Sequence, residues 1–138
     1  MTLLDTTVLS ALMREVPEEA VRKWLDRQPR LSVWVTSVTV LEVRLGLQTL
    51  PAGKRRALLM EAFERLLDLM GRRIAAFDES AAGFAADLMA ARKRSGRPGD
   101  LRDTMIAGIA LAHNATLATR NTGHFRDASI RLVNPWAS

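Results

Sequence analysis

With 138 residues, 48% of them hydrophobic and 25% charged, the chain has the balance of one globular domain over residues 1–138, with a core large enough to offset chain entropy. The lack of cysteine excludes disulfides and thiolate metal sites, and the absence of a signal-like or long apolar N-terminal segment favours a cytoplasmic protein with no membrane span. The formal net charge of +5 suits a polyanionic partner, and the scarcity of aromatic residues argues that phosphate contacts, not base stacking, would dominate nucleic-acid binding.

Short apolar runs alternate with longer segments of helical period in the first half of the chain. Buried strands are predicted over residues 2–4 and 31–36. Helices are predicted over residues 7–14, 17–27, 38–50 and 54–70. Pro17 suits the first turn of the second helix, and the run from Pro51 to Gly53 ends the third.

The same alternation continues in the second half. Strands are predicted over residues 73–77, 116–119 and, at an edge of the sheet, 130–133. Asp78 is expected to cap a helix that runs to residue 94, and Asp100 a helix that ends near residue 114. Strands that alternate with helices favour an α/β fold in which right-handed crossovers join parallel strands. We therefore expect a three-layer α/β/α sandwich around a mostly parallel sheet.

Four polar residues follow the predicted strands, at the edge where open parallel sheets bind ligands. Asp5 directly follows the first strand, and Glu42 lies in the first turns of the helix after the second. Asp103 lies in the first turn of the last long helix, and Asn121 follows the fourth strand. Hard cations such as Mg²⁺ take oxygen ligands and leave positions for phosphate oxygens. Convergence of these side chains would form a metal site of the phosphodiesterase type.

Each of these residues also has a purely structural explanation. Asp5 would cap the helix that follows it, and Asp103 stands three residues after Asp100, as in a capping box. Asn121 suits a turn. Glu42 has apolar neighbours in its helix, so its carboxylate needs a partner, which a salt bridge elsewhere in the fold would also supply. The spacing alone leaves both explanations open.

Four segments surround these residues: 3–10 (LLDTTVLS), 36–46 (TSVTVLEVRLG), 103–110 (DTMIAGIA) and 117–125 (LATRNTGHF). They resemble, in the same order, the motifs of the PIN domains, a family of ribonucleases. The ending from Asn134 to Trp136 resembles the FitB-like branch of the VapC toxins. Two positions depart from the pattern: Thr7, where many members have Asn, and Asn121, where the family often has an acid.

This resemblance implies the activity, the cofactor and the partners. It implies an endoribonuclease that depends on Mg²⁺ or Mn²⁺, forms a homodimer and is held inactive by a cognate antitoxin protein. Asp5 and Asp103 would be the principal metal ligands, directly or through water, and Glu42 would complete the shell or orient the attacking water. Asn121 would be the fourth member of the catalytic group, as a neutral oxygen ligand at best.

Supporting and RNA-binding roles follow from the same resemblance. Thr6 and Thr119 would position the ligands by hydrogen bonds. Arg102 and Arg120, each adjacent in sequence to a site residue, would meet the RNA backbone, and His124 is a further candidate for contact with substrate.

The basic residues fall in three clusters near predicted helix ends. These are Lys54–Arg56, Arg72–Arg73 and Arg92–Arg94 with Arg97. Solvated helix ends are one explanation. The other is an RNA-binding surface, and we hypothesise that the cluster from Arg92 to Arg94 lies on the RNA path.

Two other functions remain open. A domain that kept the fold and lost catalysis would be a nucleic-acid-binding or interaction module, which the neutral Asn121 favours and the three acids oppose. A haloacid-dehalogenase-like phosphatase also begins with an apolar strand and Asp, but it needs a second acid two residues later, where this chain has Thr7.

Overall fold

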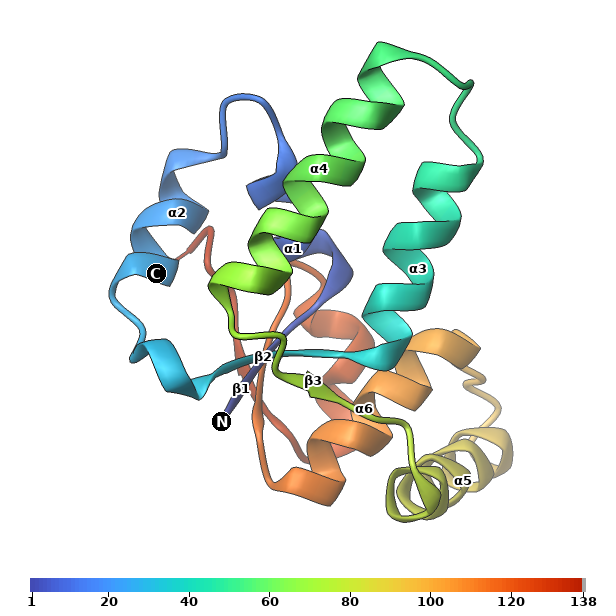
Figure 1. Ribbon diagram of the computed structural model, residues 1–138. Helices are drawn as coiled ribbons and strands as arrows, with labels where there is room; N and C mark the ends of the chain where they lie inside the picture. Colours follow the sequence, from blue (N-terminus) through green and yellow to red (C-terminus); the bar gives the residue numbers. More distant parts are fainter. Residues whose placement is uncertain (138) are drawn as a thin grey trace.

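The computed structural model describes residues 1–137, and a five-stranded sheet lies at its centre (Figure 1). The strands are β1 (Thr2–Leu4), β2 (Val33–Thr36), β3 (Ile74–Ala75), β4 (Thr116–Ala118) and β5 (Arg131–Val133). Their order is β3-β2-β1-β4-β5, and all four neighbouring pairs are parallel. The prediction of a mostly parallel sheet with residues 130–133 at an edge is confirmed.

Within residues 1–137, six α-helices and two short 3₁₀-helices connect the strands. The α-helices are α1 (Thr6–Met13), α2 (Glu19–Asp26), α3 (Ser37–Gln48), α4 (Lys54–Leu69), α5 (Glu79–Arg94) and α6 (Leu101–His113). The 3₁₀-helices are η1 (Arg30–Ser32) and η2 (Thr122–Ala128). None of the helices within residues 1–137 is long and apolar enough to cross a membrane.

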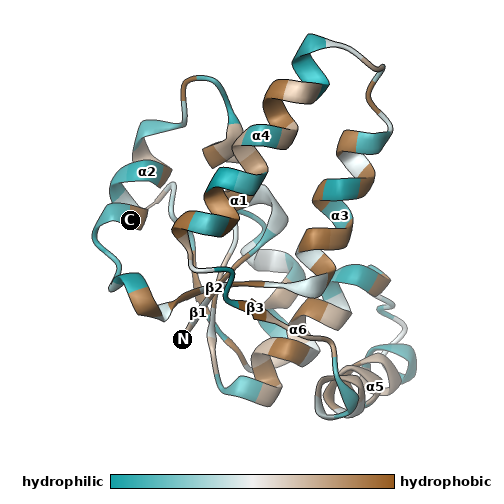
Figure 2. Cartoon of the chain, viewed as in Figure 1, coloured by the Kyte–Doolittle hydropathy of each residue, from teal (hydrophilic) through white to brown (hydrophobic). Residues whose placement is uncertain are grey.

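Alternating side chains of each strand divide the core into two layers, as the period of a β-strand requires. On one face of β1, Leu4 packs with buried residues of α1, α2 and α4, whereas Leu3 packs on the other face with residues of α5 and α6. Leu117 and Ala118 of β4 divide in the same way. Figure 2 shows apolar (brown) and hydrophilic (teal) residues alternating along α3 and α4, as in amphipathic helices. The result is the predicted α/β/α sandwich.

The predicted helix caps are present. Asp78 Oδ1 accepts a hydrogen bond from the backbone N–H of Ala81, and Asp100 Oδ1 accepts one from Asp103. At the other end of α6, Asn114 has a left-handed backbone conformation, which lets the chain leave the helix.

Three predicted boundaries are displaced, two by the local backbone and one by a contact between residues far apart in the chain. Helix α2 begins after Pro17, because Glu18 keeps an extended backbone as its N-cap. Strand β2 begins two residues later than expected, because η1 precedes it. Strand β3 has only two residues, since the backbone N–H of Phe77 donates to the side chain of Ser37 instead of to a neighbouring strand.

Helices α5 and α6 pack together very closely at one glycine. A Cβ atom on Gly108 would lie 2.5 Å from the carbonyl oxygen of Ala81 and 2.9 Å from Cβ of Ala85. A glycine is therefore required for the two helices to approach this closely. The contact holds α6, the helix that carries Asp103, against α5.

Candidate functional site

Asp5 lies at the bend between β1 and α1, where it is both a helix cap and a buried acid. Asp5 is only 4% exposed. Oδ1 accepts a hydrogen bond from the backbone N–H of Thr6 (2.8 Å), and Oδ2 accepts one from the Thr119 hydroxyl (2.7 Å). Burial raises the pKa of Asp5, and the negative charge of Asp103 adds to this effect, while the two hydrogen bonds oppose it.

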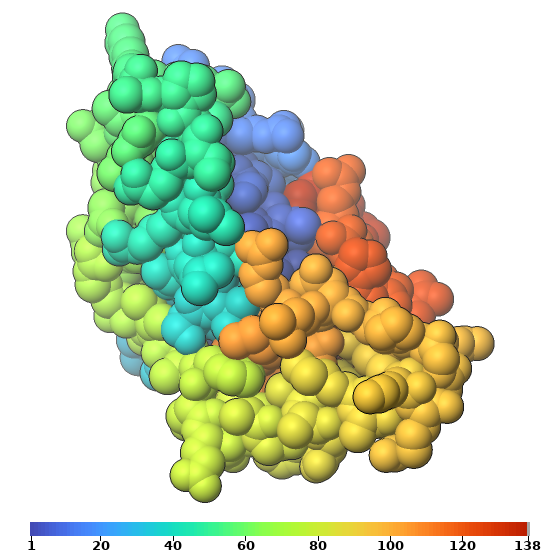
Figure 3. Space-filling view, turned by 90° about the vertical axis from the view of Figure 1, so that its right-hand side faces the viewer, coloured from blue at the N-terminus to red at the C-terminus, as the bar shows by residue number. Residues whose placement is uncertain are grey.

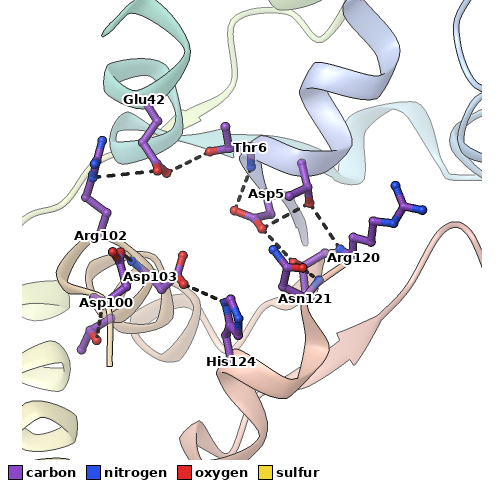
Figure 4. Close-up of polar contacts among 12 residues, drawn as sticks. Asp5, Thr6, Glu42, Asp100, Arg102, Asp103, Arg120, Asn121 and His124 are labelled. Carbon is purple, nitrogen blue, oxygen red and sulfur yellow. Dashed lines mark hydrogen bonds and ion pairs between the residues drawn. The ribbon is translucent and has the colours of Figure 1, made fainter. Parts of the chain in front are cut away.

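Glu42 lies on α3 and is joined to Asp5 through one residue. The Thr6 hydroxyl donates a hydrogen bond to Glu42 Oε1 (2.9 Å), and the Thr6 backbone N–H donates one to Asp5 Oδ1 (Figure 4). Partial burial raises the pKa of Glu42, and the negative charges of Asp5 and Asp103 raise it further, against the hydrogen bond from Thr6 and the positive charge of Arg102. Glu42 is therefore held in a negative environment.

The apolar surroundings expected for Glu42 are only partly present. Leu41 and Leu45, two of its neighbours on α3, are 55% and 50% exposed. The chain does supply a cationic partner, since Arg102 Nε lies 3.9 Å from Glu42 Oε2. Arg44, which a helix holds away from Glu42, instead pairs with Glu64 (3.3 Å). Glu42 thus lies at the rim of the core.

Asp103 forms half of the capping box that its spacing predicts. Its backbone N–H donates to Asp100 Oδ1 (3.0 Å), but its carboxylate is turned toward η2, where Oδ2 lies 3.1 Å from Nδ1 of His124. The side chain of Asp103 is therefore available to the site while its backbone completes the cap. The contact with His124 has no counterpart in the sequence pattern, because it depends on how η2 folds back toward α6.

Asn121 takes part through its backbone. The residue is exposed, its N–H donates to the Thr119 hydroxyl (3.0 Å), and its carbonyl accepts from the backbone N–H of His124 (3.0 Å). Figure 4 shows Asn121 at the start of η2, next to Asp5. The turn role that its sequence context suggests is present, and its role as a ligand stays a prediction.

The three acids face the same region from three chain segments (Figure 4). Asp5 follows β1, Glu42 comes from α3 and Asp103 from α6. The charge of Asp103 affects the pKa values of both other acids, so they form one electrostatic group. Even so, within residues 1–137 no three Asp, Glu or His side chains lie close enough to enclose a metal ion by themselves.

Two grooves run along α1 and share Thr6, Ser10 and Arg14; Glu42 lines the first of them. One, of about 440 Å³, is lined by Thr6, Glu42 and Arg55 among others, and the second, of about 270 Å³, by Thr6, Arg120 and Trp136 among others. Figure 3 shows α1 (blue) between α3 (cyan) and the orange and red C-terminal residues. An extended chain could thus cross the site along α1.

The two arginines expected to bind RNA lie at the rim of the site. Arg102 faces Glu42, as described above. The guanidinium carbon of Arg120 lies 4.8 Å from the ring centroid of Trp136, whose indole N–H donates to Glu18. The backbone N–H of Arg120 donates to the hydroxyl of Thr7 (3.3 Å), which anchors this arginine next to α1.

The proposed RNA-binding cluster from Arg92 to Arg94 is wrong for its first member. Arg92 is only 4% exposed and forms a bidentate ion pair with Asp127, with both N···O distances 2.9 Å. Its position on the helix explains this, since Ala85, Leu88 and Arg92 share the buried face of α5. The guanidinium therefore has no surface to offer to RNA.

The parallel sheet and the acids at the carboxyl ends of its strands define a class of protein. Residues 2–130 match the PIN domain family, and the chain therefore belongs to that family. The chain is 39% identical over 137 residues to the VapC ribonuclease Y4jK of Sinorhizobium fredii, covering 99% of this chain and 98% of that protein. It is also 39% identical over 137 residues to the toxin FitB of Neisseria gonorrhoeae, covering 99% of each chain.

A solved structure agrees with these relatives. The structure of FitAcB from Neisseria gonorrhoeae contains a chain with a TM-score of 0.90 to this one, at 39% identity and with 100% of both chains covered. The resemblance to PIN domains and to FitB-like VapC toxins is confirmed, as is the expected fold class. The alternative of a haloacid-dehalogenase-like phosphatase is wrong.

Proposed function

We propose that this chain is a metal-dependent endoribonuclease and the toxin component of a VapBC-type toxin–antitoxin pair, acting as one nuclease domain over residues 1–138. The observation that carries the proposal is the group formed by Asp5, Glu42 and Asp103 at the carboxyl edge of the sheet. Its support is a 39% identical relative named as a VapC ribonuclease. The reaction is hydrolysis of RNA phosphodiester bonds, in the cytoplasm where that substrate is found.

The donor set fits Mg²⁺ or Mn²⁺. The candidate donors are the carboxylate oxygens of three acids, with the neutral amide oxygen of Asn121 as a fourth. Burial first, and then repulsion among the acids, raises the pKa values of Asp5 and Glu42, and a bound cation would offset both effects. Since no three side chains enclose an ion, the protein would supply Asp5 and Asp103, with waters and Glu42 completing the shell. Mg²⁺ usually binds through one or two carboxylates and keeps several waters.

Each side chain then has a task in the reaction. When bound, the cation would stabilise negative charge on the phosphate and make water a stronger nucleophile. Thr119 and the backbone of Thr6 hold the Asp5 carboxylate in one orientation. The Thr6 hydroxyl fixes Glu42 Oε1, while Oε2 faces Arg102 at 3.9 Å. The raised pKa of the Glu42 carboxyl suits it to accept a proton from the attacking water.

Charge and grooves suit RNA as the substrate. Arg102 and Arg120 stand on opposite sides of the acids (Figure 4), and the two grooves along α1 share Thr6, the residue after Asp5. Phosphate contacts by these arginines would position the chain to be cut. The cognate antitoxin and the homodimer are the partners that the toxin family implies.

A catalytically weak PIN-fold module is the second candidate function. The observation that favours it is the neutral, exposed Asn121 in place of an acid. Such a module would bind RNA without cutting it, and its binding would not depend on Mg²⁺ or Mn²⁺.

The test uses three conservative Asp-to-Asn variants. Asp5→Asn and Asp103→Asn should abolish RNA cleavage without unfolding, because Asn caps a helix about as well as Asp. Asp100→Asn is the matched control: Asp100 caps α6 one turn from Asp103 but has no place in the acid group, so this variant should stay active. Cleavage of labelled RNA with Mg²⁺ or Mn²⁺, with and without EDTA, gives the activity, and circular dichroism checks the fold. Full activity of either site variant would overturn the proposal.

A further inference from the structure

A buried cation lies behind the site and has no role in the reaction described so far. Arginine is seldom buried in proteins without compensating partners, because removing its charge from water is costly. Arg92 is 4% exposed, and four of its N–H groups are used. The loop before α6 closes over it, since a Cβ atom on Gly99 would overlap Nη1 of Arg92.

The partners of Arg92 come from two elements that carry site residues. Nε and Nη2 of Arg92 each donate a hydrogen bond to the carboxylate of Asp127, and these two bonds form the ion pair. Nη1 donates to the hydroxyl of Thr104 (2.7 Å), the residue after Asp103 on α6, and Nη2 also donates to the backbone carbonyl of His124 (3.0 Å) on η2. An ion pair with Asp127 alone would not need the last two bonds.

We propose that Arg92 is a positioning residue that sets the placement of Asp103 against His124, by binding α6 and η2 with one rigid guanidinium. The planar guanidinium presents its donors in a fixed fork, so the two elements are held in one relative position. The charge of Asp103 reaches Arg92 as well: the hydrogen bond to Asp127 raises the pKa of Arg92 most, and the charges of Asp127 and Asp103 add to it. This inference rests on the proposed function of Asp103.

The substitution that tests this role keeps the positive charge at residue 92 and removes the planar guanidinium with its several N–H donors. Arg92→Lys can still pair with Asp127, but its single ammonium cannot also reach Thr104 and the His124 carbonyl. Arg65→Lys is the matched control, because Arg65 is exposed on α4 and belongs neither to the site nor to the basic clusters. Asp127→Asn is a second variant, which removes the negative charge at a side chain that is 53% exposed and keeps one amide oxygen as an acceptor for the guanidinium.

Kinetics separate positioning from general damage to the fold. With folding checked by circular dichroism, Arg92→Lys should lower kcat for RNA cleavage roughly 10- to 100-fold while KM for RNA stays nearly constant, as expected when a reacting group is displaced. Asp127→Asn should act in the same direction more weakly, and Arg65→Lys should leave both constants unchanged. Wild-type kcat in Arg92→Lys would overturn the inference.

A second readout does not depend on activity. The chain has only two histidines, so their imidazole proton signals are easily assigned by NMR. Mn²⁺ added without RNA should broaden the His124 signals and spare His113, which lies about 15 Å along α6 from Asp103. In Arg92→Lys the preferential broadening of His124 should be reduced, and unchanged broadening would overturn the inference while leaving the metal site intact. If Mn²⁺ does not broaden His124 even in the wild-type protein, the proposed metal site fails, and the inference fails with it.

Discussion

Replacing Thr119 with valine tests whether Asp5 is held as a charged group. Thr119 is fully buried, and its hydroxyl donates to Asp5 Oδ2 (2.7 Å) while accepting from the backbone N–H of Asn121 (3.0 Å). Valine has nearly the same shape, so the change removes the hydroxyl and creates almost no cavity. Because Asn121 is exposed, water can take over its lost hydrogen bond, and the main loss is the bond to the carboxylate.

The expected loss depends on pH. A hydrogen bond to a charged group contributes about 1.5–3 kcal/mol and one between neutral groups about 0.5–1.5 kcal/mol. The pKa of Asp5 is already above its ordinary value of 3.8 because of burial, and Thr119 opposes that rise, so Thr119→Val raises the pKa further. A carboxyl group with a raised folded-state pKa favours folding at low pH, and this contribution is lost as pH rises through that pKa. The variant's deficit should therefore grow with pH.

Urea unfolding of the metal-free protein between pH 4 and pH 8 measures this deficit. At pH 7 the free energy of unfolding should fall by about 2 kcal/mol, and Tm by roughly 6–8 °C for a chain of this size. Thr39→Val is the control: Thr39 is equally buried, but its hydroxyl accepts from the neutral Thr36 hydroxyl (3.0 Å), so its deficit should not change with pH. A deficit in Thr119→Val that is equal at acidic and neutral pH would refute the reasoning.

Three further outcomes test the acid site and its rim. Asn121→Asp should tighten Mn²⁺ binding at neutral pH in calorimetric titrations without RNA, because a fourth carboxylate adds repulsion that the cation relieves; equal affinity would place Asn121 outside the site. Since the pKa of Glu42 is raised by burial and neighbouring acids, its ionisation destabilises the metal-free fold as pH rises through that pKa, so Mn²⁺ should increase Tm more at pH 7 than at pH 5. An increase of the same size at both pH values would contradict this. In an inactive variant, Arg102→Ala and Arg120→Ala should each lower the slope of log affinity for RNA against log salt by about one unit, whereas the exposed Arg65→Ala should not.

Most of the fold could be predicted because its layers follow from local patterns. The pair Leu3 and Leu4 divides between the two faces of the sheet, as strand periodicity requires, and Asp78 and Asp100 cap the helices that follow them. The misplaced boundary of β3 depends on a tertiary contact, the hydrogen bond from the Phe77 backbone to Ser37. Such contacts join residues far apart in the chain and leave no periodic signal.

The acids of the site could be found because they come directly after strands or at the start of helices. Two contacts made by residues of η2 could not be predicted from the sequence: the contact of His124 with Asp103 and the ion pair of Asp127 with Arg92. One signal was present for Arg92. It stands seven residues after Ala85, on the apolar face of α5, where a charged side chain needs a buried partner.

Because α5 and α6 approach closely at Gly108, the site is sensitive to substitution of a residue that contacts none of its acids. Any larger side chain there would have to push α5 away, because its nearest obstacle is the backbone oxygen of Ala81. Arg92 lies on the same helix, about 16 Å further along, so a tilt of α5 would carry the guanidinium with it. The alignment of the reacting groups thus depends on the spacing of α5 and α6. Substitutions in the interface of these helices should therefore lower activity even in variants that are still stably folded.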